Sequence, residues 1–383
     1  MSLIKSISGI RGTIGGKVND NLTPLDVVKF ASAFGTWLQN NKNKKDLTLV
    51  IGRDARISGA MVNSLVTATL QGLGINVVDL GLSTTPTVEI MVPELKADGG
   101  IILTASHNPK QWNALKLLND KGEFISGENG AEVLTLAENE DFNYAEVDDL
   151  GKYETREDGF DIHIQKILEL PTVDVEAIKA KKFKVVLDAV NSTGGISIPP
   201  LLEKLGVEVV KLYCEPTGHF PHNPEPLKEH LGDICELVKK EKADMGIVVD
   251  PDVDRLALID EKGEMFGEEY TLVAVADYLL KNKNGVAISN LSSSRALRDV
   301  AKTHDSEYFA SAVGEVNVVN LMKEKNAVIG GEGNGGIIYP ELHYGRDSLV
   351  GVALFLTHLA KENKTVSELR AGYPAYFMGN KNI

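Results

Sequence analysis

Short polar segments follow apolar runs at several points of the chain, and they hold the side chains that could carry chemistry. The segment TASHNP (104–109) follows the apolar run 101–103 and would expose a hydroxyl, an imidazole and an amide together. One interpretation makes Ser106 a nucleophile or phosphate carrier, with His107 near the reacting oxygens. The other is a hydrogen-bonded turn that only caps backbone groups, and the six residues by themselves favour that turn.

The segment DPDVDR (250–255) makes a stronger case for chemistry. It places three carboxylates at alternate positions after a buried strand, namely Asp250, Asp252 and Asp254. Like charges this close are costly unless a cation neutralises them, and Mg²⁺ and Ca²⁺ prefer such oxygen ligands. An EF-hand is excluded, because Arg255 stands at the sixth position, where that loop requires glycine. The pattern favours a metal site over a solvated acidic turn.

The third segment, GGEGNGG (330–336), follows an expected short strand at 327–329. Its side chains Glu332 and Asn334 could hydrogen-bond sugar hydroxyls. The segment matches neither the phosphate-binding P-loop nor the dinucleotide fingerprint. A flexible loop and a binding loop are equally good interpretations. The glycines that would let the backbone approach a ligand include Gly331 and Gly333.

Composition limits the possible partners. The 383 residues carry a formal net charge of −14, which disfavours a nucleic-acid partner but allows a small anionic substrate held by a local basic cluster. Two cysteines are too few for a disulfide framework, as expected in a reducing cytoplasm. The start of the chain lacks the apolar block of a signal peptide, and no apolar run is long enough to span a bilayer. We therefore expect a cytoplasmic protein that contacts no membrane.

Internal repeats indicate how the segments are positioned. A buried strand, a helix and a second strand recur at 47–80, 183–212 and, more loosely, 285–314. This alternation predicts the α/β class with mainly parallel sheets. The first helix is expected to begin at Pro24, with Thr23 as its N-cap.

A second repeat places the chemistry. LKLLNDKGEF (115–124) matches LALIDEKGEM (256–265), and each is expected to form a β-hairpin whose glycine adopts a positive φ. Each follows closely on a polar loop, TASHNP or DPDVDR. Two related domains would thus present their chemistry just before the same hairpin. The predicted domains are 1–152, 153–254 and 255–372, with a short remnant at 373–383.

The order of the motifs identifies a family. The chain resembles the α-D-phosphohexomutase superfamily, which includes phosphoglucomutase, phosphomannomutase and phosphoglucosamine mutase. The resemblance covers essentially the whole chain and implies three topologically similar α/β domains, with mixed, mainly parallel sheets, around a central cleft. It rests on SISGIRG (6–12), GRDARISG (52–59), TASHNP, FPHNPEP (220–226), DPDVDR, AVGEVNV (312–318) and GGEGNGG.

The resemblance also implies roles. Ser106 would be the phosphoserine, and one Mg²⁺ would bind the three aspartates of DPDVDR together with a phosphoserine oxygen. The phosphoryl group would move reversibly between O1 and O6 of a hexose phosphate through a bound 1,6-bisphosphate, which also acts as activator. Lys116 and His107 are both candidates for moving the hydroxyl proton. The residues implied around the phosphoryl group are Arg11, His107, Lys116 and Arg255, and Glu332 and Asn334 lie in the sugar loop.

Two departures bear on specificity and turnover. The family's sugar loop usually reads Gly-Glu-x-Ser-Gly-His, whereas Asn334 and Gly336 replace the serine and histidine here. With AVGEVNV, this favours conversion of glucosamine 6-phosphate to glucosamine 1-phosphate. Glucose or mannose specificity, a phosphosugar phosphatase and a non-catalytic phosphosugar-binding protein are the alternatives.

The second departure concerns a fourth, smaller domain, which the resemblance implies after the other three. That domain, with its phosphate-binding Arg-x-Ser-Gly-Thr loop, is missing from this sequence. We therefore expect a truncated chain that folds and binds Mg²⁺ but turns over poorly. The preferred hexose, the choice between monomer and homodimer, and the resting phosphorylation of Ser106 stay open.

Overall fold

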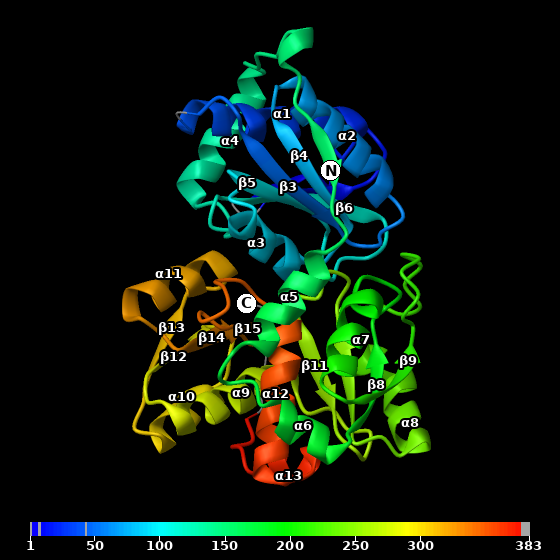
Figure 1. The fold of residues 1–383 in the computed structure, drawn as a ribbon, viewed down its shortest axis with the longest axis vertical. Coiled ribbons are helices and arrows are strands. Elements are labelled where there is room, and N and C mark those ends of the chain that lie inside the picture. The colour runs from blue at the N-terminus through cyan, green and yellow to red at the C-terminus, as the bar shows by residue number, and fades with distance from the viewer. Residues whose placement is uncertain (1, 7–8, 43, 377–383) are drawn as a thin grey trace. The chain divides into compact units, whose positions relative to one another are not determined.

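The computed structural model describes residues 2–6, 9–42 and 44–376. Residues 7–8 of the SISGIRG segment and residues 377–383 of the expected remnant lie outside that part. The chain divides into two compact units, coloured by residue number in Figure 1. The first unit comprises 1–163, 191–193 and 216–224, and the second comprises 164–190, 194–215 and 225–383.

The first unit is built on a seven-stranded sheet with the order β1-β2-β6-β5-β3-β4-β7. The strands β5, β3, β4 and β7 run parallel, while β1, β2 and β6 are antiparallel to their neighbours. The bounds are β1 (Ile4–Ser6), β2 (Gly9–Thr13), β3 (Thr48–Arg53), β4 (Asn76–Leu82), β5 (Gly99–Leu103), β6 (Trp112–Leu118) and β7 (Tyr153–Thr155).

Helices cover both faces of this sheet because side chains alternate along each strand. Leu49 and Ile51 of β3 pack in a cluster with α1, α2 and α4, whereas Val50 between them packs with α3. The helix α1 begins at Pro24 as predicted, and Thr23 and Asp26 form a reciprocal capping box. The helices are α1 (Pro24–Asn41), α2 (Gly59–Gly72), α3 (Thr85–Glu94), α4 (Gly127–Asn139) and the short η1 (Val147–Asp149), while α5 (Gly159–Leu168) joins the two units.

The second unit holds two four-stranded sheets with the orders β11-β10-β8-β9 and β15-β14-β12-β13. In each sheet the first pair is antiparallel and the others are parallel. The bounds are β8 (Lys184–Asp188), β9 (Glu208–Leu212), β10 (Met245–Val249), β11 (Leu256–Ile259), β12 (Val286–Asn290), β13 (Glu307–Ser311), β14 (Ile329–Glu332) and β15 (Gly336–Ile338).

Helices also pack on the sheets of the second unit. The helix α12 is buried from Ser348 to Ala360 and contributes many of the apolar side chains in the unit's largest core cluster. Among the described residues no helix combines the length and apolarity that a bilayer span needs. The helices are α6 (Val175–Lys181), α7 (Gly194–Lys204), α8 (Gly232–Glu241), α9 (Glu268–Asn282), α10 (Ala296–Thr303), α11 (Glu315–Lys325), α12 (Ser348–Glu362) and α13 (Val366–Ala371), with the short η2 (Lys228–His230).

The three sheets share one topology, which confirms the expected α/β class with mixed sheets. Each contains a parallel strand–helix–strand unit, a second helix, a third parallel strand and an antiparallel neighbour, giving β6-β5-β3-β4, β11-β10-β8-β9 and β15-β14-β12-β13. The connection between the last two strands falls at the same place each time. It spans 104–111, 250–255 and 333–335, so TASHNP, DPDVDR and the middle of GGEGNGG occupy equivalent loops.

The two predicted hairpins are confirmed, although their second limbs are short. After β6 the chain turns at Gly122, which has a φ of 74°, and returns through a single bridge between Leu118 and Phe124. After β11 it turns at Gly263, also at 74°, and bridges Ile259 to Met265. The sequence repeat therefore reflects a repeat of backbone conformation.

The sheets extend past the residues at which the domain boundaries were expected. Tyr153–Thr155 forms β7 and pairs with β4, and Leu256–Ile259 forms β11 and pairs with β10. The domain boundaries after residues 152 and 254 stay a prediction.

Candidate functional site

In the first unit, four predicted catalytic residues line one pocket: Arg11, Ser106, His107 and Lys116. Sheet register explains how two of them meet. Arg11 on β2 lies directly opposite Ala114 on β6, and Lys116 follows two residues later, so both side chains leave the same face. Gly9 lines the same pocket with a φ of 133°, and a Cβ there would lie 2.3 Å from the carbonyl oxygen of Leu115. No other residue type fits that position without a shift.

Ser106 itself adopts an uncommon backbone conformation. Its φ is 47°, in the left-handed region, and the residue is only 8% exposed. Its N–H donates to Oγ1 of Thr104 at 2.9 Å, and its Oγ lies 3.4 Å from Nδ1 of His107. Strain of this kind costs on the order of 1–3 kcal/mol and persists only where the surroundings impose it.

Those surroundings are dominated by one buried arginine. Arg56, 1% exposed, follows β3 and uses all five of its N–H donors on the Ser106 loop and on Asp54. Nε pairs with Oδ2 of Asp54 at 2.9 Å. The other donors reach four backbone carbonyls, those of Ser106, Asn108 (2.7 Å), Pro109 (2.8 Å) and Trp112 (3.1 Å).

Two further contacts complete this support. Asp54 Oδ2 also accepts a hydrogen bond from Thr104 Oγ1 at 2.6 Å, which links the arginine to the residue that holds the Ser106 amide. The ring of Phe220, from the FPHNPEP segment, lies 5.2 Å from the Arg56 guanidinium. The GRDARISG motif therefore supports the Ser106 loop through Arg56, and Phe220 of FPHNPEP packs on that arginine.

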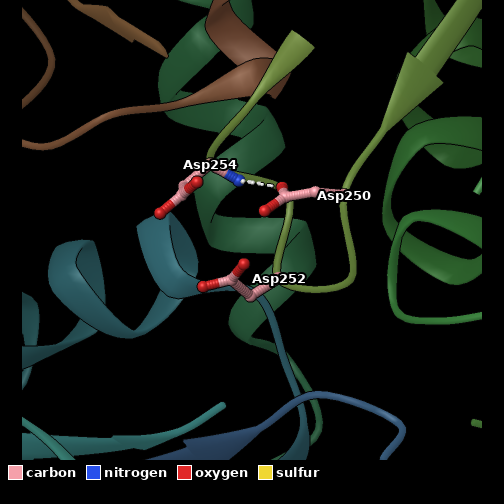
Figure 2. A group of neighbouring side chains, drawn as sticks. All are labelled: Asp250, Asp252 and Asp254. Atoms are coloured by element: carbon pink, nitrogen blue, oxygen red, sulfur yellow. Dashed lines mark hydrogen bonds between the residues drawn. The ribbon is translucent and has the colours of Figure 1, made fainter. Parts of the chain in front are cut away.

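In the second unit, the three aspartates of DPDVDR converge. Figure 2 shows Asp250, Asp252 and Asp254 on the loop that follows β10. All three are fully buried, and each offers an oxygen within 4.8 Å of the others. Asp250 Oδ1 accepts the backbone N–H of Asp254 and that of Arg255, both at 3.1 Å, which folds the loop back on itself.

This donor set fits a hard divalent cation. Buried carboxylates at such spacing repel one another strongly, and oxygen ligands match Mg²⁺. Val253, between two of the ligands, has a φ of 64°, an unfavourable conformation for a β-branched residue. Its carbonyl accepts the N–H of Ser348 at 3.2 Å, so the first residue of α12 holds the strained turn. Among the described residues, this triad is the one cluster with metal-ligand spacing.

The glycine-rich segment differs from the expectation of a strand at 327–329 followed by a long loop. The strand β14 runs from Ile329 to Glu332, and only residues 333–335 connect it to β15. The reason is packing. A Cβ at Gly330 would lie 2.3 Å from Met322 Sδ, and one at Gly331 would lie 2.1 Å from the carbonyl oxygen of Gly336. Gly330 and Gly331 therefore belong to β14, where there is no room for a side chain, and Gly333 lies in the loop.

The predicted sugar-loop side chains lie at this edge. Glu332 is 5% exposed and accepts hydrogen bonds from Asn290 Nδ2 at 2.8 Å and from the Gly314 N–H at 3.2 Å. Asn334 Oδ1 accepts the N–H of Gly336 at 3.3 Å. Burial raises the pKa of Glu332, but the nearby Arg346 and these donors outweigh it and leave the pKa below its usual value. Glu332 is therefore an anion at neutral pH.

The metal loop and the sugar loop touch within the second unit. Leu256, the residue after Arg255, donates its N–H to the carbonyl of Gly335 at 3.1 Å. Arg255 Nη1 lies 3.6 Å from Glu225, and its buried Nε donates no hydrogen bond. A guanidinium with an unused donor suits an anionic ligand.

Sequence reasoning missed two residues that organise these loops, Arg56 and Arg346. Arg56 lies inside GRDARISG, so its motif was noticed but its role was not. Arg346, which precedes α12, forms ion pairs with Asp254, Glu315 and Glu332. The one feature of the sequence near Arg346 that marks a structural position is Asp347, whose side chain caps α12 by accepting the N–H groups of Leu349 and Val350.

Comparison with protein families gives matches over most of the chain. Three models described as phosphoglucomutase/phosphomannomutase, alpha/beta/alpha domains I, II and III, match residues 4–144, 161–263 and 267–376.

Curated relatives extend the match. A phosphoglucomutase/phosphomannomutase of Thermococcus kodakarensis is 38% identical over 96% of this chain and 80% of its own length. A phosphoglucosamine/phosphogalactosamine mutase of Sulfurisphaera tokodaii is 34% identical over 99% and 82%. A probable phosphoglucosamine mutase of Methanopyrus kandleri is 32% identical over 96% and 78%.

A solved structure agrees with the fold. A putative phosphomannomutase from Thermus thermophilus superposes with a TM-score of 0.87 at 25% identity, covering 97% of this chain and 83% of that one.

Proposed function

This chain belongs to the phosphoglucomutase/phosphomannomutase family, and on that premise we propose that it interconverts glucosamine 6-phosphate and glucosamine 1-phosphate. The chain is a phosphohexomutase, an intramolecular phosphotransferase, as its curated relatives are. In the proposed reaction Ser106 carries the phosphoryl group, gives it to the free hydroxyl of the hexose phosphate and takes the other phosphoryl group back.

The observation that carries the proposal is the pocket around Ser106. Phosphoryl transfer depends on alignment and charge stabilisation more than on covalent chemistry by the protein. Arg11 and Lys116 bring two cationic groups to the pocket that Ser106 lines, where they would stabilise phosphoryl oxygens. The contacts of Arg56 with the loop carbonyls hold the backbone of Ser106 in its positive-φ conformation, and so set the position from which its side chain projects.

Proton transfer must accompany each step. When the phosphoryl group leaves Ser106, the bond from Oγ to phosphorus breaks and Oγ gains a proton, while the hexose hydroxyl loses one. We propose that Ser106 Oγ exchanges this proton with His107, whose Nδ1 lies 3.4 Å away. Lys116 and His107 remain the two candidates for the hexose hydroxyl.

We further propose that Asp250, Asp252 and Asp254 hold one Mg²⁺. When bound, the ion supplies positive charge against the phosphoryl oxygens. The aspartates come from a single loop closed by the Asp250 carboxylate, so they would need little rearrangement to bind it. A phosphoserine oxygen as a further ligand stays a prediction from the resemblance.

Specificity for an amino sugar is the finer part of the proposal. It is supported by Asn334 and Gly336 in the sugar loop and by relatives named phosphoglucosamine mutases. The Thermococcus relative, named phosphoglucomutase/phosphomannomutase, supports glucose or mannose phosphates as the alternative. Glu332 and Asn334 are the proposed hydroxyl-binding side chains, and Gly331 and Gly333 the backbone positions beside them.

The test is the intact mass and phosphopeptide map of the protein before and after incubation with Mg²⁺ and a hexose 1,6-bisphosphate, the proposed activator. One phosphoryl group on Ser106 supports the carrier role. Steady-state rates with glucosamine, glucose and mannose 6-phosphates then rank the substrates. An unmodified Ser106 with tight phosphosugar binding would favour a non-catalytic binding protein, and release of inorganic phosphate without isomerised sugar would favour a phosphatase.

A further inference from the structure

Arg346 joins carboxylates from three separate segments of the second unit. Its Nη2 lies 2.7 Å from Asp254 Oδ2 in the metal loop, and its Nη1 lies 3.1 Å from Glu332 Oε2 in the sugar loop. Its Nε lies 2.8 Å from Oε2 of Glu315, the first residue of α11. Arg346 is 8% exposed, so these contacts are largely shielded from water.

The geometry of the side chain matters here. A guanidinium is planar and rigid, and its donors point in fixed directions. Asp254 and Glu332 therefore bind two nitrogens of one rigid group, and a shift of either carboxylate moves the group that holds the other. Lysine carries the same charge but has a single nitrogen on a flexible stem, so it cannot hold three carboxylates in this arrangement.

Charge points the same way. Five carboxylates lie in or beside this cluster: the aspartate triad, Glu315 at the start of α11 and Glu332 at the end of β14. Burial raises the pKa of Glu315, whereas the pKa of Glu332 is lowered. Asp254 and Glu332 share one cation because Nη2 and Nη1 of Arg346 contact them at 2.7 Å and 3.1 Å, so the strength of each ion pair depends on the other.

From this arrangement we propose that Arg346 is a positioning residue that couples cation binding at the aspartate triad to the state of Glu332 in the sugar loop. The inference rests on the proposed function for the identity of the two sites. Asp254 would be held for the cation only while Arg346 is also held by Glu332. Loss of the Glu332 charge would let Arg346 pair more strongly with Asp254 and compete with the cation.

The test is a double-mutant cycle on Mg²⁺ affinity, measured by calorimetry without any sugar. Arg346→Lys should raise the dissociation constant roughly tenfold or more, as substitutions behind metal ligands do. Glu332→Gln should raise it about fivefold, although Glu332 belongs to the sugar loop. In the Arg346→Lys background, Glu332→Gln should add almost nothing.

A matched control separates coupling from simple loss of charge. Glu268→Gln replaces another carboxylate of the second unit, at the first residue of α9. Its effect on Mg²⁺ affinity should be small and the same in both backgrounds. Far-UV circular dichroism verifies folding, and if Arg346→Lys fails to fold, a comparison of Glu332→Gln with Glu268→Gln still decides the matter.

Each outcome bears on the proposal. Equal effects of Glu332→Gln and Glu268→Gln, or additive effects of Glu332→Gln and Arg346→Lys, would overturn the coupling while leaving the mutase proposal intact. Absence of Mg²⁺ binding by the wild-type chain would overturn the proposed metal site and the coupling with it. Phosphorylation of Ser106 is measured separately and decides the carrier role.

Discussion

The Ser106 loop and the aspartate loop occupy equivalent positions in two sheets, yet they are supported in different ways. Each connects a parallel strand to its antiparallel neighbour, and each contains one non-glycine residue with positive φ, Ser106 or Val253. The first loop is held by Arg56 through four backbone carbonyls and one carboxylate. Arg346 contacts the second loop through one carboxylate, that of Asp254, and its other two partners, Glu315 and Glu332, are carboxylates as well.

The difference follows from what each loop is proposed to hold. Carbonyl acceptors fix the backbone of the Ser106 loop without adding formal charge, which suits a loop that is to carry a phosphoryl anion. Carboxylate acceptors offset the charge of Arg346, which leaves the aspartate loop net negative and ready for a cation. The same topology thus supports opposite electrostatics, and buried arginines set both.

The largest expected effect is on the first loop itself. Ser106→Ala should lower mutase activity at least about 10³-fold, because the proposed phosphoryl carrier is removed. Mg²⁺ affinity should stay near wild type if the aspartates suffice for binding. A coupled assay for hexosamine 1-phosphate measures the first property and calorimetry the second. Activity within tenfold of wild type would refute the carrier role.

Arg56, which holds that loop, should matter nearly as much, in this case for the stability of the first unit. Arg56→Ala leaves Asp54 and four carbonyls without their donor, so the first unit should lose about 3–5 kcal/mol of stability. The chain has two tryptophans, Trp37 and Trp112, both in the first unit, so their fluorescence during urea unfolding reports on that unit.

Arg156→Ala is the control for this prediction. Arg156 lies in the same unit but forms a partly exposed pair with Asp158, which is expected to contribute no more than about 1 kcal/mol. Similar losses of stability for Arg56→Ala and Arg156→Ala would contradict the proposed support of the Ser106 loop by Arg56.

Mg²⁺ binding to the aspartate loop should stabilise the second unit. Mg²⁺ at about 100 times its dissociation constant should stabilise the second unit by about 2.7 kcal/mol. This gain in stability should appear when unfolding is followed by circular dichroism. It should be smaller when unfolding is followed by tryptophan fluorescence, because both tryptophans lie in the first unit. EDTA should reverse it, and Asp252→Asn should abolish it. A shift that survives Asp252→Asn would place the cation elsewhere.

The smallest expected effect concerns acid stability of the second unit. Burial raises the pKa of Asp277, but hydrogen bonds from His358, His304 and Tyr373 outweigh it and lower that pKa well below its usual value. A lowered folded-state pKa contributes stability that is complete above the unfolded value of about 4 and is lost as the pH falls further.

Replacement of this carboxylate tests that contribution. Asp277→Asn should cost about 1–2 kcal/mol at pH 7 and flatten the fall in stability below pH 4. Urea unfolding followed by circular dichroism between pH 3 and pH 7 measures both effects. An unchanged slope would assign the acid sensitivity to other carboxylates.

Much of the site could be predicted because its chemistry is local in sequence. The alternate aspartates of DPDVDR come from one loop, so their convergence needs only that loop to turn. Arg11 and Lys116 meet because their strands pair, and the family resemblance placed both near Ser106 in advance.

The glycines show the opposite case. Gly330 and Gly331 were interpreted as loop residues, yet they form part of β14, because Met322 and Gly336 leave no room for a Cβ. A run of glycines does not distinguish space kept for a ligand from space taken by a neighbouring element.

The sequence by itself determined the α/β class, the three repeated strand–helix–strand units and the identity of the reactive loops, because periodicity and loop motifs are local properties. Only the tertiary structure decided which arginines support those loops. Arg56 reaches a carbonyl 50 residues away and Arg346 a carboxylate 92 residues away. An arginine in a sequence shows that a cation is present but not which acceptors the fold will place around it, and those acceptors decide whether it fixes a backbone or links two binding loops.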